Sequence, residues 1–449
     1  MAPTLRLAGL VALIGVAALV LPLAVISALW IVLAVLAIVD LQFVRTAPSA
    51  TYEVSSLARG VASSFRITLT PSAAIRRASA ITIRQPIGAD IRIAPNTAST
   101  TSLDASITAM RRGIHQLPLA AVRLVGPIRL ASMVHELTGA PKVTVHPDLP
   151  TAQRLVIAAR RGLLQVDGRN RGPLGIGTEF EAVREYRPDD DVRQINWLAT
   201  ARTGRAMSTV YRQEDDRDLL IAIETGRLTA GSFIGEKAES LDGSIGDGLR
   251  PEERIGSELS ELSLITRLDT LFDAAVALAL VADEVGDRVG LLAYDESERV
   301  RLHPKRRGGQ GIVQAALDIE PRLVQPDHAQ VALRLPALRR SVVVVLVELL
   351  DEANAGGLVV AIARCQASHD VIIVTPDDPE VLAARADGRP SLQVATGDLL
   401  ADRHALIAQL SATGALVVTG PPQTLATIAT RAYLSRRSGR RPKVHTRAQ

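Results

Sequence analysis

The chain has 449 residues, more than one domain usually holds, so two or three domains are expected. Its 51 basic and 47 acidic side chains leave a formal net charge of +4, which is mild for this length. Such a balance argues against a dedicated nucleic-acid-binding protein, whose excess positive charge is concentrated in a stripe, and the single cysteine excludes an intramolecular disulfide and any multi-cysteine metal site.

An uncharged apolar run fills residues 7–39. One membrane span needs roughly 20 apolar residues, so this run is long for one helix and short for two full ones. Pro22 lies near the middle, where a tight reversal is easiest, and we therefore expect a transmembrane hairpin over residues 1–45. Its two helices are predicted at Leu5–Leu21 and Leu23–Val44. One arginine flanks the run on each side, which favours both ends on the cytoplasmic side of a cell membrane and makes lipid a partner. A cleaved signal peptide and a single crossing are the competing interpretations.

Between residues 46 and 150, polar and apolar residues alternate in short runs separated by turn residues. A period of two indicates half-buried strands and predicts a β-sandwich-like domain. The expected strands include Phe65–Thr70, Ala80–Arg84, Ile91–Ile93 and Val143–Asp148. This part also contains His115, His135 and His146, but none has a second ligand at metal-binding spacing, so no metal site is predicted.

Residues 151–214 hold the most distinctive stretch, which runs from Gly177 to Gly204. Acids and arginines alternate there around a tyrosine, a proline turn, three aspartates and one of the two tryptophans. Arg187-Pro188 predicts that a strand ends in a turn. The aspartates after it, Asp190 among them, are suited to capping a helix N-terminus. Apolar residues at helical spacing then predict a short amphipathic helix that ends near Thr203-Gly204, before an edge strand.

Two roles remain open for this signature segment. Its arginines and carboxylates could form an ion-pair network, a clasp that holds the segment on the following domain. Alternatively, its arginines and tryptophan, which are favoured at binding hot spots, could form a surface that recognises a partner protein. Both roles involve the same residues: Glu179, Arg184, Glu185, Tyr186, Asp190, Arg193, Asn196, Trp197 and Arg202. Catalysis is not expected, because acids paired with arginines stay ionised and are poor general acids near neutral pH.

Residues 215–434 alternate short apolar runs with helical patterns, which predicts an α/β domain with a doubly wound, largely parallel sheet. Strands are expected at Asp218–Glu224, Arg288–Tyr294, Ser341–Leu349, Asp370–Thr375 and Ala415–Thr419. Helices are expected at Leu271–Val285, Gly311–Leu317, Leu358–Ala367, Leu399–Leu410 and Thr424–Leu434. Cys365 lies in the third of these helices, where we expect a small buried core residue. A Gly-, Ser- and Glu-rich stretch at 228–263 predicts a mobile insertion, and a basic tail at 435–449 either lies on anionic lipid or is a solvated end.

The signature segment resembles the pattern of the domain-of-unknown-function-58 family, bacterial proteins whose C-terminal half is similar to a von Willebrand factor A domain. The matching residues are Glu179-Phe180, Arg184-Glu185-Tyr186, Pro188, Asp190-Asp191, Arg193, Ile195, Trp197 and Ala201-Arg202. Asp189 replaces the family's usual glycine, and Asn196 stands where an aspartate is common. The resemblance implies a von Willebrand A-like fold and, as the protein partner, a MoxR-type AAA+ ATPase.

The resemblance also implies a place for a metal ion. Von Willebrand A domains carry an Asp-x-Ser-x-Ser loop whose hard oxygen ligands suit Mg²⁺. Here the aligned loop has Glu224 for the aspartate, and Gly226 and Leu228 for the two serines. Arg227 adds a positive charge that would repel a divalent cation. We therefore expect a degenerate metal loop, with metal binding absent or strongly weakened and no cofactor.

Together these features predict a membrane-anchored, non-enzymatic adaptor or scaffold. It would present its von Willebrand A-like domain to the protein partner in complex assembly or chaperone-like work. The sequence has neither a Walker A loop nor a G-x-S-x-G nucleophile turn. The main alternative is a divalent-metal-dependent binding or hydrolytic domain that uses the acids near Asp190 and Glu224. A third interpretation is a cell-envelope protein whose soluble part faces outward.

Overall fold

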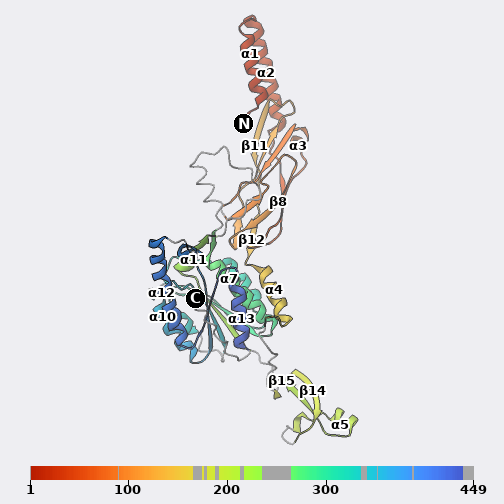
Figure 1. The fold of residues 1–449 in the computed structure, drawn as a ribbon. Coiled ribbons are helices and arrows are strands. Elements are labelled where there is room, and N and C mark those ends of the chain that lie inside the picture. Colours follow the sequence, from red (N-terminus) through yellow and green to blue (C-terminus); the bar gives the residue numbers. More distant parts are fainter. Residues whose placement is uncertain are drawn as a thin grey trace. The chain divides into compact units, whose positions relative to one another are not determined.

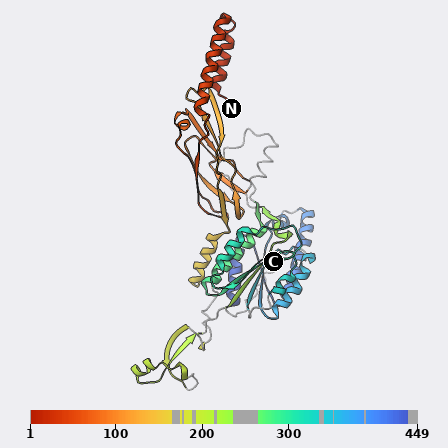
Figure 2. The ribbon, with the colours of Figure 1, turned by 180° about the vertical axis from the view of Figure 1, so that it is seen from behind.

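A computed structural model describes residues 2–88, 90–164, 174–175, 179–187, 192–212, 217–234, 264–334, 341–350, 352–386 and 389–437. The chain divides into two compact units. The first consists of residues 1–150, 232–269 and 313–319, and the second of residues 151–231, 270–312 and 320–449. Figure 1 labels the helices and strands, and Figure 2 shows the ribbon from behind.

The first unit begins with two apolar helices, α1 (Leu5–Ala17) and α2 (Leu23–Val44) (Figure 1). They share a small apolar cluster that includes Ile14 and Leu33. The sequence predicts a first helix that reaches Leu21, whereas α1 ends at Ala17 and a turn follows. Of the described helices, α2 is the one long and apolar enough to cross a membrane, and α1 is apolar but shorter.

The rest of the first unit is rich in antiparallel strands. One sheet has the order β2-β4-β8-β6, with β2 (Ala50–Val54), β4 (Ser63–Leu69), β8 (Ser102–Ala109) and β6 (Ile91–Ala94). A second has the order β1-β11-β10-β5-β7, with β1 (Ala2–Pro3), β11 (Ala131–Glu136), β10 (Ala121–Val125), β5 (Ala80–Arg84) and β7 (Thr97–Ala98). A third has the order β3-β12-β9, with β3 (Leu57–Ala58), β12 (Lys142–His146) and β9 (Gly113–Gln116). The short helix α3 (Ala73–Arg77) follows β4, and β17 (Ser232–Ile234) pairs with β18 (Leu264–Thr266).

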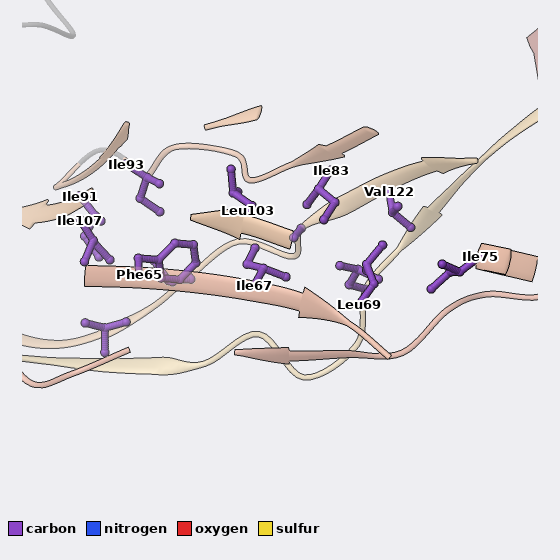
Figure 3. Close-up of a cluster of buried hydrophobic side chains, with 14 of the residues drawn as sticks. Phe65, Ile67, Leu69, Ile75, Ile83, Ile91, Ile93, Leu103, Ile107 and Val122 are labelled. Atoms are coloured by element: carbon purple, nitrogen blue, oxygen red, sulfur yellow. The ribbon is translucent and has the colours of Figure 1, made fainter. Parts of the chain in front are cut away.

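Alternating side chains of these strands form the core of the first unit. Along β4 buried and less buried residues alternate, so that Phe65, Ile67 and Leu69 point inward. Figure 3 shows these side chains packed with others from neighbouring strands, including Ile83, Ile91, Ile93, Leu103, Ile107 and Val122. The period-two pattern in the sequence therefore marks the inward face of this core.

A buried carboxylate joins α2 to the strands. Asp40 is 0% exposed, and its two oxygens accept hydrogen bonds from the backbone N–H groups of Ile128 (2.8 Å), Leu130 (2.7 Å) and Ala131 (2.8 Å). These residues lie at or just before the start of β11. A Cβ on Gly126, which follows β10, would lie 2.3 Å from the Asp40 carboxyl group, so this close approach requires glycine.

The second unit contains a three-stranded antiparallel sheet with the order β13-β15-β14. Its strands are β13 (Leu174–Gly175), β15 (Met207–Arg212) and β14 (Glu179–Glu185), and between β14 and β15 lie the 3₁₀ helix η1 (Val192–Gln194) and α5 (Trp197–Thr203). The sequence predicts an edge strand at Met207–Arg212, which is wrong, because β15 pairs with β13 on one side and with β14 on the other.

The larger sheet of the second unit has the order β20-β19-β16-β21-β22-β23. Its strands are β16 (Asp218–Glu224), β19 (Arg288–Tyr294), β20 (Glu298–Lys305), β21 (Val342–Leu346), β22 (Asp370–Pro376) and β23 (Leu416–Gly420). All neighbours pair in parallel except β19 and β20. In chain order this is 3-2-1-4-5-6, the order of a doubly wound sheet, and the expectation of a mixed α/β fold is confirmed. The antiparallel edge strand β20 is absent from the sequence prediction.

Helices lie on both faces of this sheet. Besides α5, the helices that follow the β-rich part are α4 (Leu149–Arg160), α7 (Arg267–Glu284), α8 (Gly309–Asp318), α9 (Ala329–Arg334), α10 (Glu352–Gln366), α11 (Pro379–Ala386), α12 (Pro390–Ala412) and α13 (Leu425–Arg437). Figure 1 shows α10 and α12 on one face and α7 and α13 on the other. Cys365 of α10 is 3% exposed in the core beneath that helix, as the sequence predicts, and burial raises the pKa of its thiol to about 11.

Parts of three sequence predictions lie outside the described residues. They are residues 235–263 of the expected insertion, residues 438–449 of the basic tail, and Asp190 of the signature segment. Residues 227–230 of the expected insertion form the 3₁₀ helix η2 (Arg227–Ala230), which leads into β17.

Candidate functional site

The signature segment contains the helix α5 and two strands, β14 and β15, of the three-stranded sheet. Glu179 pairs with Arg212 at one end of the β14–β15 ladder, and Glu185 pairs with Met207 at the other. The N–H of Tyr186 donates to the carbonyl of Ala206 (2.8 Å) just beyond the ladder. The chain between these strands is therefore a closed loop whose ends are fixed by backbone hydrogen bonds.

Asn196 fixes the start of α5. Its Oδ1 accepts a hydrogen bond from the N–H of Ala199 (2.9 Å), its Nδ2 donates to Oγ1 of Thr209 on β15 (3.2 Å), and its backbone N–H donates to the carbonyl of Met207 (2.8 Å). The sequence predicts a helix start at the aspartates near Asp190, which is wrong, because an intervening 3₁₀ turn moves the α-helical start to Trp197. Asparagine caps a helix N-terminus as well as aspartate does, so Asn196 can serve as the cap at a position where the family commonly has aspartate.

The predicted end of the helix is correct. Gly204 caps α5 in the left-handed conformation (φ 71°), which glycine adopts without strain. Oγ1 of Thr200 accepts a hydrogen bond from the N–H of Met207 (3.0 Å), so α5 is tied to β15 near both of its ends. The sequence gives no signal for Thr200 or Thr209, because their partners are defined only by the folded loop.

Three large apolar side chains of this loop are exposed, and we call them the Trp197 surface: Trp197 (71% exposed), Leu198 (67%) and Val192 (63%). Ile195 and Ala199, by contrast, are half-buried, and α5 has no fully buried residue. Exposed aromatic and aliphatic side chains on a helix that is held in place are suited to contact with a protein partner.

The charged residues of the segment lie mostly in solvent. Arg205 forms an ion pair with Glu185 (2.8 Å), and both side chains are more than half exposed. Arg184 donates a hydrogen bond to the backbone carbonyl of Glu185 (3.0 Å). Exposed pairs of this kind contribute little to the stability of a fold, because water and salt screen them. Arg193 and Arg202 are exposed as well. The sequence does not indicate Arg205, which lies 20 residues from its partner.

The second candidate site lies where β16 ends, at the degenerate metal loop. Thr225 donates two hydrogen bonds to the carbonyl of Tyr294, from its N–H (2.8 Å) and its Oγ1 (3.1 Å). The N–H of Arg322 donates to the carbonyl of Thr225, and the N–H of Arg227 donates to the carbonyl of Val324, each at 2.9 Å. Backbone hydrogen bonds therefore hold the loop after β16 against residues 322–324.

Gly226 leaves little room for a side chain in this loop. A Cβ on Gly226 would lie 3.0 Å from the carbonyl oxygen of Val324 and 3.3 Å from Oε1 of Glu224. The carbonyl of Gly226 also accepts a hydrogen bond from Oγ1 of Thr229 (2.8 Å). Gly226 thus has no side-chain ligand to offer and permits the close approach of residues 324–326.

The carboxyl group of Glu224 is buried and neutral near pH 7. It is 1% exposed, and neither oxygen has a hydrogen bond of good geometry to a described residue. Burial, and to a smaller extent the charge of nearby Glu348, raise its pKa to about 8 against the opposing effect of a backbone hydrogen bond from Glu348. Burial also raises the pKa of Tyr294, whose hydroxyl lies 3.1 Å from Nδ1 of His328.

These residues do not fit the metal that the fold family implies. The hydroxyls of Thr225 and Thr229 are directed at backbone carbonyls, and Leu228 has no ligand atom. Across the part of the chain that the structure describes, no group of three or more His, Cys, Asp or Glu side chains is placed to hold a metal ion. A Mg²⁺ ion requires about six oxygen ligands in near-octahedral geometry, which this loop does not offer.

Two histidines of the first unit have structural contacts. A ring nitrogen of His135 lies 2.7 Å from the carbonyl oxygen of Val44, and one of His115 lies 3.0 Å from the carbonyl oxygen of Arg111. His135 therefore lies against the end of α2.

The structure thus has an exposed helix α5 and an α/β sheet in which the loop after β16 is hydrogen-bonded to residues 322–324. The family model for "Protein of unknown function DUF58" matches residues 182–242 and 256–401. Over these residues the chain matches the DUF58 family.

Solved structures give weaker likenesses. A von Willebrand factor type A protein from Catenulispora acidiphila is 14% identical, with a TM-score of 0.26, over 53% of this chain and 46% of that one. Domains 4 and 5 of the S-layer protein SbsC are 11% identical, with a TM-score of 0.14, over 22% of this chain and 50% of theirs. The chain thus spans about half the length of each. No curated protein matches the chain.

Replacement of Asn196 by alanine is expected to loosen α5, because the N–H of Ala199 loses its acceptor. A lost cap costs about 1 kcal/mol, so the amides of α5 should exchange with deuterium about fivefold faster. Asn196→Asp, which keeps the acceptor, should exchange at nearly the original rate. Equal exchange in all three proteins would contradict this role of Asn196.

Replacement of Glu224 by glutamine is expected to remove a pH dependence of stability. The folded pKa is raised, so the contribution of the protonated group is complete below the unfolded value of 4.5 and is lost as the pH rises through about 8. The loss is on the order of a few kcal/mol, since one pKa unit corresponds to about 1.4 kcal/mol. Melting temperatures of the full chain in detergent at pH 5, 7 and 8.5 should fall with pH more steeply than those of Glu224→Gln.

The exposed Glu296 supplies a matched control for that series, because Glu296→Gln should keep the original slope. Parallel slopes for the original protein and Glu224→Gln would contradict the buried neutral acid. Tight Mg²⁺ binding in calorimetry that Glu224→Gln abolishes would contradict the degenerate metal loop.

Proposed function

We propose that this protein is a membrane-anchored, non-enzymatic adaptor whose Trp197 surface binds a protein partner in complex assembly or chaperone-like work. The exposure of Trp197 carries this proposal. A tryptophan that is 71% exposed, beside an exposed leucine, lies on a helix that Asn196 and Thr200 fix to β15. A rigid aromatic group loses little conformational entropy on binding, which makes it a favourable hot spot.

A MoxR-type AAA+ ATPase is the proposed partner, and this choice rests on the family resemblance. The closed end of β16 supports a binding role over a metal-dependent hydrolytic one, because Glu224 is neutral and its neighbouring hydroxyls are directed at carbonyls. The proposal assigns no catalytic residue to this chain.

The anchor in this proposal is a hairpin of α1 and α2. With 22 residues, α2 is about 33 Å long, close to the roughly 30 Å of a bilayer's hydrocarbon core. The turn between the helices exposes Leu19 (84%) and Val20 (86%), which a bilayer would cover. Both ends of the hairpin, and the soluble units, would then lie on the cytoplasmic side of the cell membrane. A single crossing by α2 is the competing arrangement.

Trp197→Ala is expected to leave the protein folded and to weaken binding of the ATPase at least 30-fold, the usual loss for a hot spot of about 2 kcal/mol. Co-purification of the full-length membrane protein with the ATPase, followed by titration of the purified pair, measures this loss. Val394, also exposed (66%), supplies the control variant Val394→Ala, which should bind normally. Undiminished binding by Trp197→Ala would contradict the docking role, and loss of folding would favour the clasp.

A further inference from the structure

Five arginines surround the base of the two apolar helices, and we call them the arginine collar: Arg6, Arg45, Arg76, Arg77 and Arg129. They come from the start of α1, the end of α2, the last turn of α3 and the loop before β11. All five are exposed, and none forms an ion pair with a residue that the structure describes.

Hydrogen bonds bring these elements together. Oγ1 of Thr4, the residue that caps α1, lies 2.5 Å from the carbonyl oxygen of Arg129, so Arg6 and Arg129 belong to one end of the hairpin. Oγ1 of Ser79, just after α3, donates to the carbonyl of Gly126 (2.7 Å) in the same loop. Figure 1 shows α3 and β11 at the base of the two helices.

The end of α2 also lies close to α3. The guanidinium group of Arg77 lies 5.2 Å from the centre of the Phe43 ring on α2. Arg45 immediately follows the last residue of that helix. The collar is therefore one region of the first unit.

Acidic side chains do not balance this charge. Residues 2–50, 71–85 and 121–135 contain one acid, Asp40. That acid is 0% exposed, and its oxygens face the N–H groups of the loop before β11. The five guanidinium groups thus present net positive charge directly beside an apolar surface, where exposed Ile128 (40%) adds a further apolar group.

We propose that the arginine collar binds the headgroups of anionic phospholipids, on the side of the membrane from which the β-rich part of the first unit emerges. Guanidinium groups bind phosphate with paired hydrogen bonds, and basic residues next to a membrane segment are attracted to acidic lipid. An excess of arginine on one side also orients that side toward the cytoplasm. This inference rests on the membrane anchoring in the proposed function and adds the lipid class that the anchor selects.

A tryptophan in place of Phe43 offers a reporter at the collar, because Phe43 lies beside Arg77 and two residues before Arg45. The full chain with Trp30→Phe, Phe43→Trp and Trp197→Phe is reconstituted in phosphatidylcholine vesicles that contain brominated phosphatidylcholine or brominated phosphatidylglycerol. Bromine quenches the fluorescence of the introduced tryptophan on contact, so the two titrations give the relative association of each lipid. Phosphatidylglycerol should be preferred about threefold or more at low salt, and this preference should decline toward equality at about 0.5 M salt, where the Debye length is short.

The variant Arg6→Gln/Arg45→Gln/Arg76→Gln should lose at least half of the preference. A matched control, Arg84→Gln/Arg161→Gln/Arg385→Gln, removes the same charge from exposed positions elsewhere and should keep it. Far-ultraviolet dichroism of all three proteins verifies that they are folded.

Equal quenching by the two lipids in the starting protein, or an unchanged preference in the collar variant, would overturn the lipid assignment while leaving the anchor intact. An absence of quenching by either lipid would show that α2 is outside the bilayer, and would overturn the anchor together with the collar's role.

Discussion

The carboxylate of Asp40 is the constraint on which the arrangement of the first unit depends. A charge buried at the end of an apolar helix is costly unless hydrogen bonds compensate for the lost water. Here three backbone N–H groups of one loop supply that compensation, and Gly126 lets the loop come close enough. Because these bonds have defined directions, the end of α2 holds one position on the strands. The location of the arginine collar at the base of the helices follows from this contact.

In the second unit, a different buried carboxyl group, that of Glu224, lies at the end of β16. A doubly wound sheet offers a ligand site beyond its strand ends, near the reversal of strand order. In this chain that place holds a protonated Glu224 and a loop whose backbone is bonded to Arg322 and Val324. Because this loop is held by its own hydrogen bonds, the exposed apolar side chains of α5 are better suited than the end of β16 to contact a protein partner. The hydroxyls of this loop are directed at backbone carbonyls, while the large apolar side chains of the signature segment are exposed.

Much of the fold could be predicted from local patterns. The strand β16 has the predicted bounds because Asp218–Glu224 is an uninterrupted apolar run between two acids. The edge strand β20 was missed although Val300 and Leu302 alternate with arginines, because this alternation is short and ends at Pro304, a residue that strands tolerate mainly at edges. The start of α5 was misplaced because three aspartates compete with Asn196 as caps, and the contact with Thr209 that favours Asn196 exists only after folding. Likewise, the partners of Asp40 lie 88 to 91 residues away, a separation that no local pattern reveals.

The central claim is that the Trp197 surface contacts a partner directly. A photoreactive amino acid in place of Trp197, in the full chain within its native membrane, tests that contact without purification. The account predicts a light-dependent crosslink to an AAA+ ATPase from this position and none from the same group at Leu333, which is exposed elsewhere in the second unit. Crosslinks of equal strength from both positions, or none from position 197 when the ATPase is present, would contradict it.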